Sequence, residues 1–214
     1  MRGLVGDALQ AGWEQVTRLG AIKPGHRRAR RFGAFGARSV ICFPVAALFG
    51  ERYIRLGEGS VIGPYSTLSA GVGPDQVLER ECVIRIGDRC VIGKGSAIVG
   101  HTSVEIGDDV WTGPHVYVTD ANHGYEDVTM PIGVQFAANE PVRIGAGSWL
   151  GTGVVVLPGS TVGRHVVVGA GAVVAHDLPD NTVAVGNPAR VVRRYESGEW
   201  VSVGDDGHPP TSSR

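Results

Sequence analysis

The chain has 214 residues and a formal net charge of -1, which is long enough for one domain with a sizeable core and gives no electrostatic basis for nucleic-acid binding. Its 33 glycines and 7 % aromatic residues favour a fold with many tight turns. Cys42, Cys82 and Cys90 form no CxxC pair and are odd in number, so we expect a reducing, cytoplasmic location.

Residues 1–38 differ from the rest, and we expect an N-terminal arm that is partly helical. Apolar residues recur at helical spacing from Leu4 to Leu19, without the apolar core of a secretory signal. A basic cluster follows, made of Arg27, Arg28, Arg30, Arg31 and Arg38. This cluster fits peripheral contact with the inner face of a membrane, a phosphorylated ligand, or a solvated arm packed on a neighbouring subunit.

From Leu56 the sequence repeats every six residues. Each unit starts with an aliphatic residue, is usually followed by glycine, and has a small residue four places on, as in LGEGSV at 56, IGKGSA at 92 and VGAGAV at 168. A period of six suits short strands joined by tight corners and stacked as a solenoid. The pattern predicts that the aliphatic residue points inward, that glycine provides the corner conformation, and that small residues such as Ser60, Ser96 and Ala172 fit a narrow interior.

The repeat resembles that of the hexapeptide-repeat acyltransferases, over roughly residues 54–194. The resemblance implies an all-β fold, a left-handed parallel β-helix with three faces per coil, and a homotrimer with active sites between subunits. We place the β-helix domain at residues 39–194, with a C-terminal closing segment in which 189–196 forms a short helix or a final strand. Residues 195–214 are predicted to be a flexible tail.

With three hexads per coil, coils begin near residues 56, 86, 106, 144 and 162. This register puts Ala121 one coil beyond His101 and aligns Trp111 with Trp149. Two segments interrupt it, at residues 73–85 and 123–143. An excursion as long as the second is usually functional when it leaves a compact solenoid.

The excursion starts at His123, which holds the last place of its coil, whereas His101, His115 and His165 hold the fourth place of their hexads. Acyl transfer from a thioester to a hydroxyl needs a base, and imidazole suits this task because its ordinary pKa is about 6.5. We therefore predict that His123 is a general base. Asp120, Asn122 and Glu126 lie near it in the sequence and are candidates to orient the ring or an acceptor.

The stretch NHGYED at 122, Pro131-Ile132 and the VxIGxxxWxG pattern at 142–151 are similar to the sugar and maltose O-acetyltransferase branch. That resemblance implies a catalytic role for His123, acetyl-CoA as donor, a carbohydrate acceptor and no metal. The residues that we assign to acceptor binding are Asp120, Asn122, Glu126, His101 and Trp149, and those that we assign to the donor are Trp149, Thr152, Gly169, Ala170, His176, Arg190 and Arg193.

The chain departs from that branch in two places. Ala175-His176 stand where the family often has Thr-Lys, which puts one phosphate contact in doubt. The N-terminal domain of the branch is not recognisable in residues 1–53, so small free sugars are doubtful acceptors, and exopolysaccharide, lipid-linked saccharide or a glycosylated metabolite are plausible.

Three other functions stay open at this point. The first is N-acetylation of a nucleotide-linked amino sugar. The second is a γ-type carbonic anhydrase, for which His101, His115 and His123 would have to share one zinc ion, although the usual close histidine pair is absent. The third is a trimeric scaffold without catalytic activity.

Overall fold

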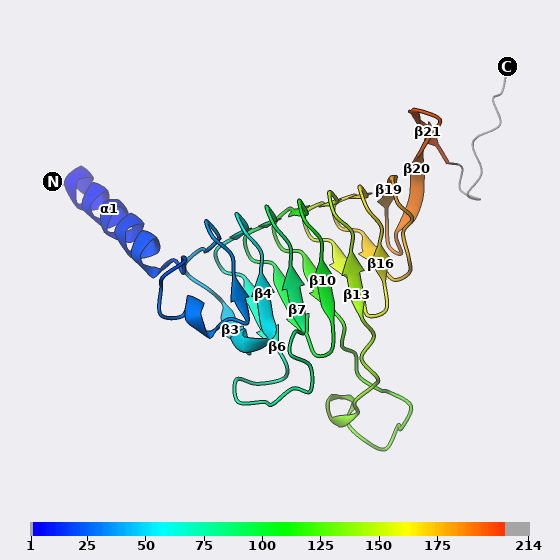
Figure 1. Ribbon diagram of the computed structural model, residues 1–214, viewed down its shortest axis with the longest axis horizontal. Coiled ribbons are helices and arrows are strands. Elements are labelled where there is room, and N and C mark those ends of the chain that lie inside the picture. Colours follow the sequence, from blue (N-terminus) through cyan, green and yellow to red (C-terminus); the bar gives the residue numbers. More distant parts are fainter. Residues whose placement is uncertain (1, 204–214) are drawn as a thin grey trace.

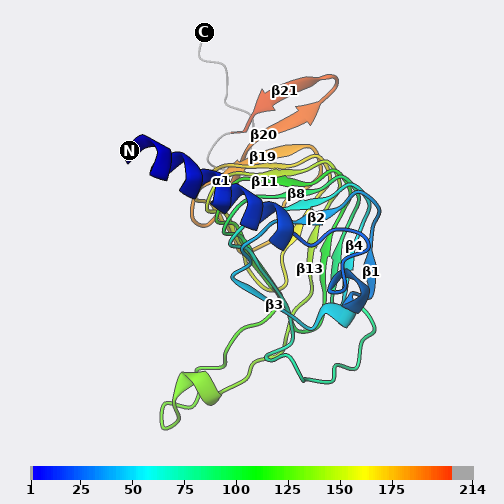
Figure 2. The same cartoon turned by 90° about the vertical axis from the view of Figure 1, so that its left-hand side faces the viewer.

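The computed structural model describes residues 2–203, whose backbone winds into a parallel β-helix with three faces (Figures 1 and 2). Face 1 contains β1 (Ala34–Phe35), β4 (Ile54–Leu56), β7 (Ile84–Ile86), β10 (Val104–Ile106), β13 (Val142–Ile144) and β16 (Thr161–Val162). Face 2 contains β2 (Val40–Ile41), β5 (Val61–Ile62), β8 (Val91–Ile92), β11 (Trp111–Thr112), β14 (Trp149–Leu150), β17 (Val167–Val168), β19 (Thr182–Val185), β20 (Arg190–Glu196) and β21 (Glu199–Ser202). Face 3 contains β3 (Ala47–Phe49), β6 (Thr67–Ala70), β9 (Ala97–Gly100), β12 (Tyr117–Thr119), β15 (Val155–Val156) and β18 (Val173–Val174). The helices are α1 (Arg2–Gly20) and the 3-10 turns η1 (Ala29–Arg31), η2 (Glu51–Tyr53) and η3 (Ile132–Val134).

The hexads build the core in the predicted way. The aliphatic first residues, such as Ile62, Ile92 and Leu150, are fully buried, and burying a side chain of this size contributes roughly 1.5–3 kcal/mol. The small residues four places on are buried as well, and the Ser60 hydroxyl donates a hydrogen bond of 2.8 Å to the carbonyl oxygen of Gly87 in the next coil. The interior is therefore a stack of aliphatic layers, with serine, alanine, cysteine or valine beside each turn of the chain.

The glycine after the aliphatic residue has a different role from the predicted one. A Cβ on Gly57 would lie 2.5 Å from the backbone of Gly87, so this position needs glycine because neighbouring coils approach closely. The left-handed corner conformation falls two residues later, at the fourth place, as at Gly59 with φ 67°. His115 (φ 60°) and His165 (φ 54°), which also hold the fourth place of their hexads, adopt the same conformation.

Both ends of the β-helix extend further than the hexads indicate. Ala34 of β1 pairs with Arg55 of β4, so the first coil starts before residue 39 and the arm is shorter than 1–38. Residues 190–196 form strand β20 and not a helix, and β20 pairs antiparallel with β19 and β21. The predicted tail from residue 195 is therefore a β-hairpin up to residue 202, and residues 204–214 lie outside the described part.

Two loops leave the β-helix at the same edge, where the chain passes from face 3 to face 1 (Figures 1 and 2). The first spans residues 71–83 between β6 and β7, and the second spans residues 120–141 between β12 and β13. We call the second one the excursion loop.

The outer surfaces of faces 1 and 2 differ in chemistry. On face 1, Arg55, Arg85, Glu105 and Arg143 lie in register. On face 2, an apolar ladder lies in register, consisting of Val40, Val61, Val91, Trp111, Trp149, Val167 and Val183. Trp111 and Trp149 are paired as predicted, and their exposed fractions are 56 % and 47 %.

Helix α1 covers the predicted helical segment and stands away from the coils (Figure 1). Within residues 2–203, none of the helices has both the length and the apolar character needed to cross a bilayer.

Candidate active site

The excursion loop and face 3 enclose a cleft of about 920 Å³ at the edge where the loop leaves the β-helix. The register of β12 on β9, with Thr119 opposite Val99, brings the predicted pair His101 and Ala121 together. His123 and Asn122 line the same cleft. Three of the polar residues that line this cleft were therefore predicted from the sequence, namely His101, Asn122 and His123.

His123 is held by the far side of its own loop. Its Nδ1 atom lies 3.2 Å from the carbonyl oxygen of Gln135, and its ring packs against that of Phe136 with centroids 6.1 Å apart. A carbonyl oxygen only accepts hydrogen bonds, so Nδ1 carries a proton, and in the neutral imidazole Nε2 then keeps its lone pair. The backbone N–H of His123 donates to Asn122 Oδ1 at 2.9 Å, which fixes the start of the loop.

Gln135 was not predicted, and it organises the excursion loop from the inside. Its side-chain Nε2 donates to the carbonyl oxygens of Asp127 (2.8 Å) and Met130 (3.0 Å), and its Oε1 accepts from the backbone N–H of Asp127 at 3.2 Å. One side chain thus holds the turn that places its own carbonyl oxygen against His123. No motif in the sequence signals this role, because the contacts span up to eight residues of irregular backbone.

Asp120 is not placed to contact the acceptor substrate, contrary to the prediction. Its side chain is fully buried, and its carboxylate accepts hydrogen bonds from three successive backbone N–H groups, those of His101 (2.8 Å), Thr102 (2.7 Å) and Ser103 (2.6 Å). Its own carbonyl oxygen accepts from the N–H of Glu140 at 2.8 Å. Asp120 therefore fastens both ends of the excursion loop and the His101 corner to one point.

Glu126 also lies outside the cleft, although the sequence assigns it to acceptor binding. Its carboxylate accepts hydrogen bonds from its own N–H and from that of Tyr125 (2.9 Å for the latter), and these bonds lower the pKa of the Glu126 carboxyl. Its interactions are within the loop. The carboxylate that does line the cleft is that of Glu140, which was not predicted from the sequence.

Most of the residues predicted to bind the donor lie on other edges of the prism than the His123 cleft. Trp149 projects from face 2, and Thr152 and Ala170 follow at the corner between faces 2 and 3, where the N–H of Gly171 donates to the Thr152 carbonyl oxygen at 2.8 Å. Gly169 belongs to the same corner, and His176 lies beside Ala175, which lines the His123 cleft. Arg190 and Arg193 are exposed on β20, where Arg193 donates to the carbonyl oxygen of Trp200 at 3.3 Å. Within one chain, the edge that carries Trp149, Thr152 and Gly169-Ala170 is therefore distinct from the edge that carries His123.

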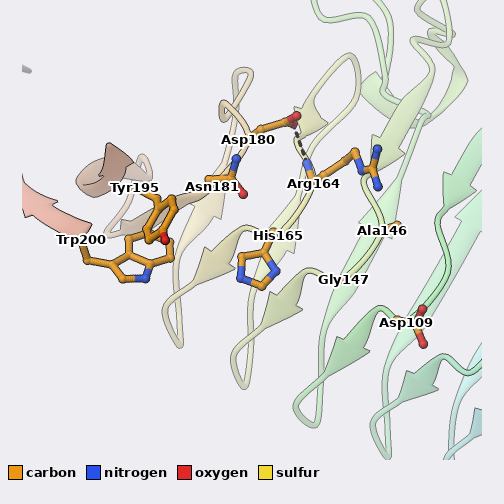
Figure 3. A pocket seen from close by; sticks show the side chains of 9 residues that line it. All are labelled: Asp109, Ala146, Gly147, Arg164, His165, Asp180, Asn181, Tyr195 and Trp200. Atoms are coloured by element: carbon orange, nitrogen blue, oxygen red, sulfur yellow. Dashed lines mark hydrogen bonds between the residues drawn. The ribbon is translucent and has the colours of Figure 1, made fainter. Parts of the chain in front are cut away.

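A second hollow of about 740 Å³ lies between the face 1–face 2 edge and the C-terminal hairpin (Figure 3). The rings of Tyr195 and Trp200 close one end, with centroids 5.5 Å apart, and His165 faces them from the neighbouring coil. Asp180 accepts a hydrogen bond of 2.7 Å from the backbone N–H of Arg164. The lining contains none of the residues that the sequence assigns to catalysis or to the donor.

The three histidines considered for a zinc site lie at two different corners. His101 and His123 share the cleft at the face 3–face 1 edge, whereas His115 lies at the face 2–face 3 corner between β11 and β12. Within residues 2–203, no group of three His, Cys, Asp or Glu side chains is placed to hold a metal ion.

Comparison with known proteins places the chain in a family. Residues 141–176 match the family model described as bacterial transferase hexapeptide (six repeats), and residues 78–119 match that of the hexapeptide repeat of succinyl-transferase. A putative lipopolysaccharide biosynthesis O-acetyl transferase of Escherichia coli is 36 % identical over 150 residues, which cover 67 % of this chain and 76 % of the relative. The chain belongs to the hexapeptide-repeat acyltransferase family.

Membership of this family agrees with the left-handed winding expected of the β-helix. A probable acetyltransferase of Mycobacterium tuberculosis is 38 % identical over 143 residues, 67 % of this chain and 45 % of that protein. The chain spans about half the length of the first curated relatives that it matches. Among solved structures, a maltose O-acetyltransferase from Clostridium difficile is 28 % identical and superposes with a TM-score of 0.53, over 86 % of this chain and 84 % of the other.

Proposed function

We propose that this protein is an acetyl-CoA-dependent O-acetyltransferase that acts on a hydroxyl group of a carbohydrate, with His123 as the general base. The observation that carries the proposal is the hydrogen bond from His123 Nδ1–H to the Gln135 carbonyl oxygen, which leaves Nε2 as a base at the cleft. Relatives named as O-acetyltransferases of sugars and lipopolysaccharide support the reaction class.

The proposed reaction is a direct transfer. His123 Nε2 takes the proton of the acceptor hydroxyl as the oxygen attacks the thioester carbonyl carbon. The tetrahedral intermediate then expels the CoA thiolate, which takes the proton from the imidazolium, so that an ester and free CoA thiol are the products. The thioester is already activated, so the step uses neither a covalent enzyme intermediate nor a metal ion.

We propose further that the active site forms between the subunits of a homotrimer. A second copy is needed because the Trp149, Thr152 and Gly169-Ala170 edge of one chain lies away from its own His123 cleft. The apolar ladder of face 2, with Trp111 and Trp149 exposed, is a surface that suits burial against another subunit. The pantetheine arm would run along the edge formed by Thr152 and Ala170, and the phosphates would reach His176, Arg190 and Arg193.

The charge of the cleft favours a neutral acceptor. Among the described residues that line it, Glu140 carries the only formal charge, and neither lysine nor arginine is present. The diphosphate of a nucleotide-linked amino sugar normally requires cationic partners. A carbohydrate hydroxyl is therefore favoured over the amino group of a nucleotide sugar.

Replacing Arg190 with alanine is expected to raise the KM for acetyl-CoA about tenfold, with little change in kcat, because an exposed charge-assisted contact to phosphate contributes roughly 1–2 kcal/mol. Acetyl-pantetheine, which lacks the nucleotide, serves as the control, and its KM should be the same for both proteins. Equal KM values for acetyl-CoA in wild type and Arg190→Ala would remove this arginine from the donor site.

Replacing Gln135 with leucine is expected to lower kcat by roughly 10- to 100-fold, because the turn that positions the carbonyl oxygen against His123 loses three hydrogen bonds and a small displacement of a base is costly. Hydrogen exchange of the loop amides should accelerate in the same variant. The control is Val128→Ala, in the same loop, whose side chain is 94 % exposed. An unchanged kcat in Gln135→Leu would show that the clamp does not serve catalysis.

The proposed function is tested by a screen of acceptors with acetyl-CoA, in which thiol release is measured. Neutral oligosaccharides and glycosides with apolar aglycones should release thiol, whereas nucleotide-linked amino sugars should not. Thiol release with the nucleotide-linked amino sugars alone would favour N-acetylation and overturn the proposal.

A further inference from the structure

We propose that α1 and the basic segment that follows it dock the protein onto the surface of an anionic lipid bilayer. This interaction is separate from acyl transfer. The proposal rests on the exposure of the helix, the distribution of its residues around the axis, and the charge of residues 21–38.

Every large apolar side chain of α1 is exposed. The exposed fractions include 75 % for Leu4, 71 % for Leu9 and 67 % for Leu19, and the others are Val5, Trp13 and Val16. Figure 1 shows that α1 extends beyond the first coil and stands away from the β-helix. A folded chain rarely leaves so much contiguous apolar surface in water without a partner for it.

The exposed apolar residues share one side of the helix. At about 100° per residue, Leu4, Leu19, Val5, Val16, Leu9 and Trp13 fall within about half of the circumference. Asp7, Gln10, Glu14, Thr17 and Arg18 occupy the opposite half, and among residues 3–19 Gln15 is the one polar residue on the apolar side. A helix with this division, with leucine and tryptophan on its apolar side, is typical of helices that lie in the plane of a membrane surface.

The segment after the helix is strongly basic. Residues 21–38 contain Lys23, Arg27, Arg28, Arg30, Arg31 and Arg38 and no acidic residue. Arg28 and Arg31 contact Glu51 (3.1 and 3.7 Å), and Arg38 contacts Glu58 at 2.7 Å. Within residues 2–203, Lys23, Arg27 and Arg30 form no ion pair and are exposed.

These charges select a bilayer over a second copy of the chain as the partner. Self-association through α1 would bring together the basic segments of the copies, which repel one another. A coiled-coil seam through Val5, Leu9, Val16 and Leu19 would have Gly12 at its centre, where it fills no space. Anionic headgroups attract the free cations next to the apolar face, and an apolar helix combined with a basic patch provides the two signals that stable peripheral binding requires.

The test is sedimentation of the full-length protein with vesicles of phosphatidylcholine alone or mixed with phosphatidylglycerol. Wild type should bind the mixed vesicles at least tenfold more tightly than the neutral ones, and high salt should weaken binding. Leu9→Glu and the double change Arg27→Glu, Arg30→Glu should each reduce binding at least tenfold. Gln10→Glu adds the same charge to the opposite side of the helix, and it should stay within about twofold of wild type.

Circular dichroism and light scattering of each variant establish that the fold and oligomeric state persist. The proposal is overturned if wild type does not sediment with the mixed vesicles, or if Leu9→Glu and Gln10→Glu bind alike. It is also overturned if Leu9→Glu alters the oligomer while vesicle binding is unchanged, because the apolar side would then be a subunit contact. None of these readouts depends on acetyl transfer.

Discussion

Replacing His123 with asparagine is expected to lower kcat by at least about 10²-fold, because general-base catalysis of this kind contributes roughly 10²–10⁴-fold. Asparagine has a similar size, so the shape of the cleft should persist while the basic Nε2 atom is lost. The KM for acetyl-CoA should change little, since most of the residues proposed to bind the donor are on a different edge of the chain from His123. Initial rates of thiol release at saturating donor and acceptor measure the effect.

The matched control for this experiment is His165→Asn. His165 has a left-handed backbone (φ 54°) at the face 1–face 2 corner, where asparagine is well tolerated, and it lies outside the His123 cleft. This variant should keep wild-type kcat. If His123→Asn also kept it, the base would have to be another group, and the nearest imidazole to test would be that of His101.

Replacing Asp120 with alanine is expected to lower the free energy of unfolding on the order of 3 kcal/mol. The change leaves three backbone N–H groups, that of buried Ser103 and those of partly buried His101 and Thr102, without the carboxylate that accepts their hydrogen bonds at 2.6–2.8 Å, and unpaired donors shielded from water are costly. Chemical denaturation of the two proteins measures the difference. kcat should also fall, because both ends of the excursion loop are fastened at Asp120.

Asp109→Ala is the comparison for this prediction. Asp109 is exposed, and its carboxylate pairs with Arg89 at 2.7 and 2.8 Å in a contact that water and salt weaken. The loss of stability should therefore be clearly smaller than in Asp120→Ala. Equal losses in the two variants would mean that the buried carboxylate does not hold the loop.

The repeat predicted the β-helix because each hexad specifies which residue is buried and where the chain turns. That is why the pairing of Trp111 with Trp149, and of the His101 corner with Ala121, followed from counting residues. The start of the first coil was missed, and this coil was not counted among the hexads, because its units depart from the pattern, with Cys42 where other units have glycine. Strand β20 was predicted only as one of two alternatives, and β21 was missed, because the two pair antiparallel as a hairpin, which a hexad period does not describe.

The site was predictable only where its residues belong to the repeat or start the loop. His123 stood out because it is placed where the repeat stops. The structural roles of Asp120 and Gln135 could not be predicted. A carboxylate next to a catalytic candidate suggests a substrate contact, and its hydrogen bonds to the backbone are visible only in the structure. The hydrogen bonds of Gln135 likewise depend on the path of an irregular loop. The same reasoning applies to Glu126, whose carboxylate bonds to the backbone of its own loop.

The most direct test of the central claim is the mass and the chemical stability of the product formed from acetyl-CoA and a neutral glycoside acceptor. We predict a gain of one acetyl group, with one free CoA thiol per product, formed by wild type and strongly reduced with His123→Asn. Mild base should remove the acetyl group, as expected of an ester. An acetyl group that resists mild base, or a product formed equally well by His123→Asn, would contradict the account.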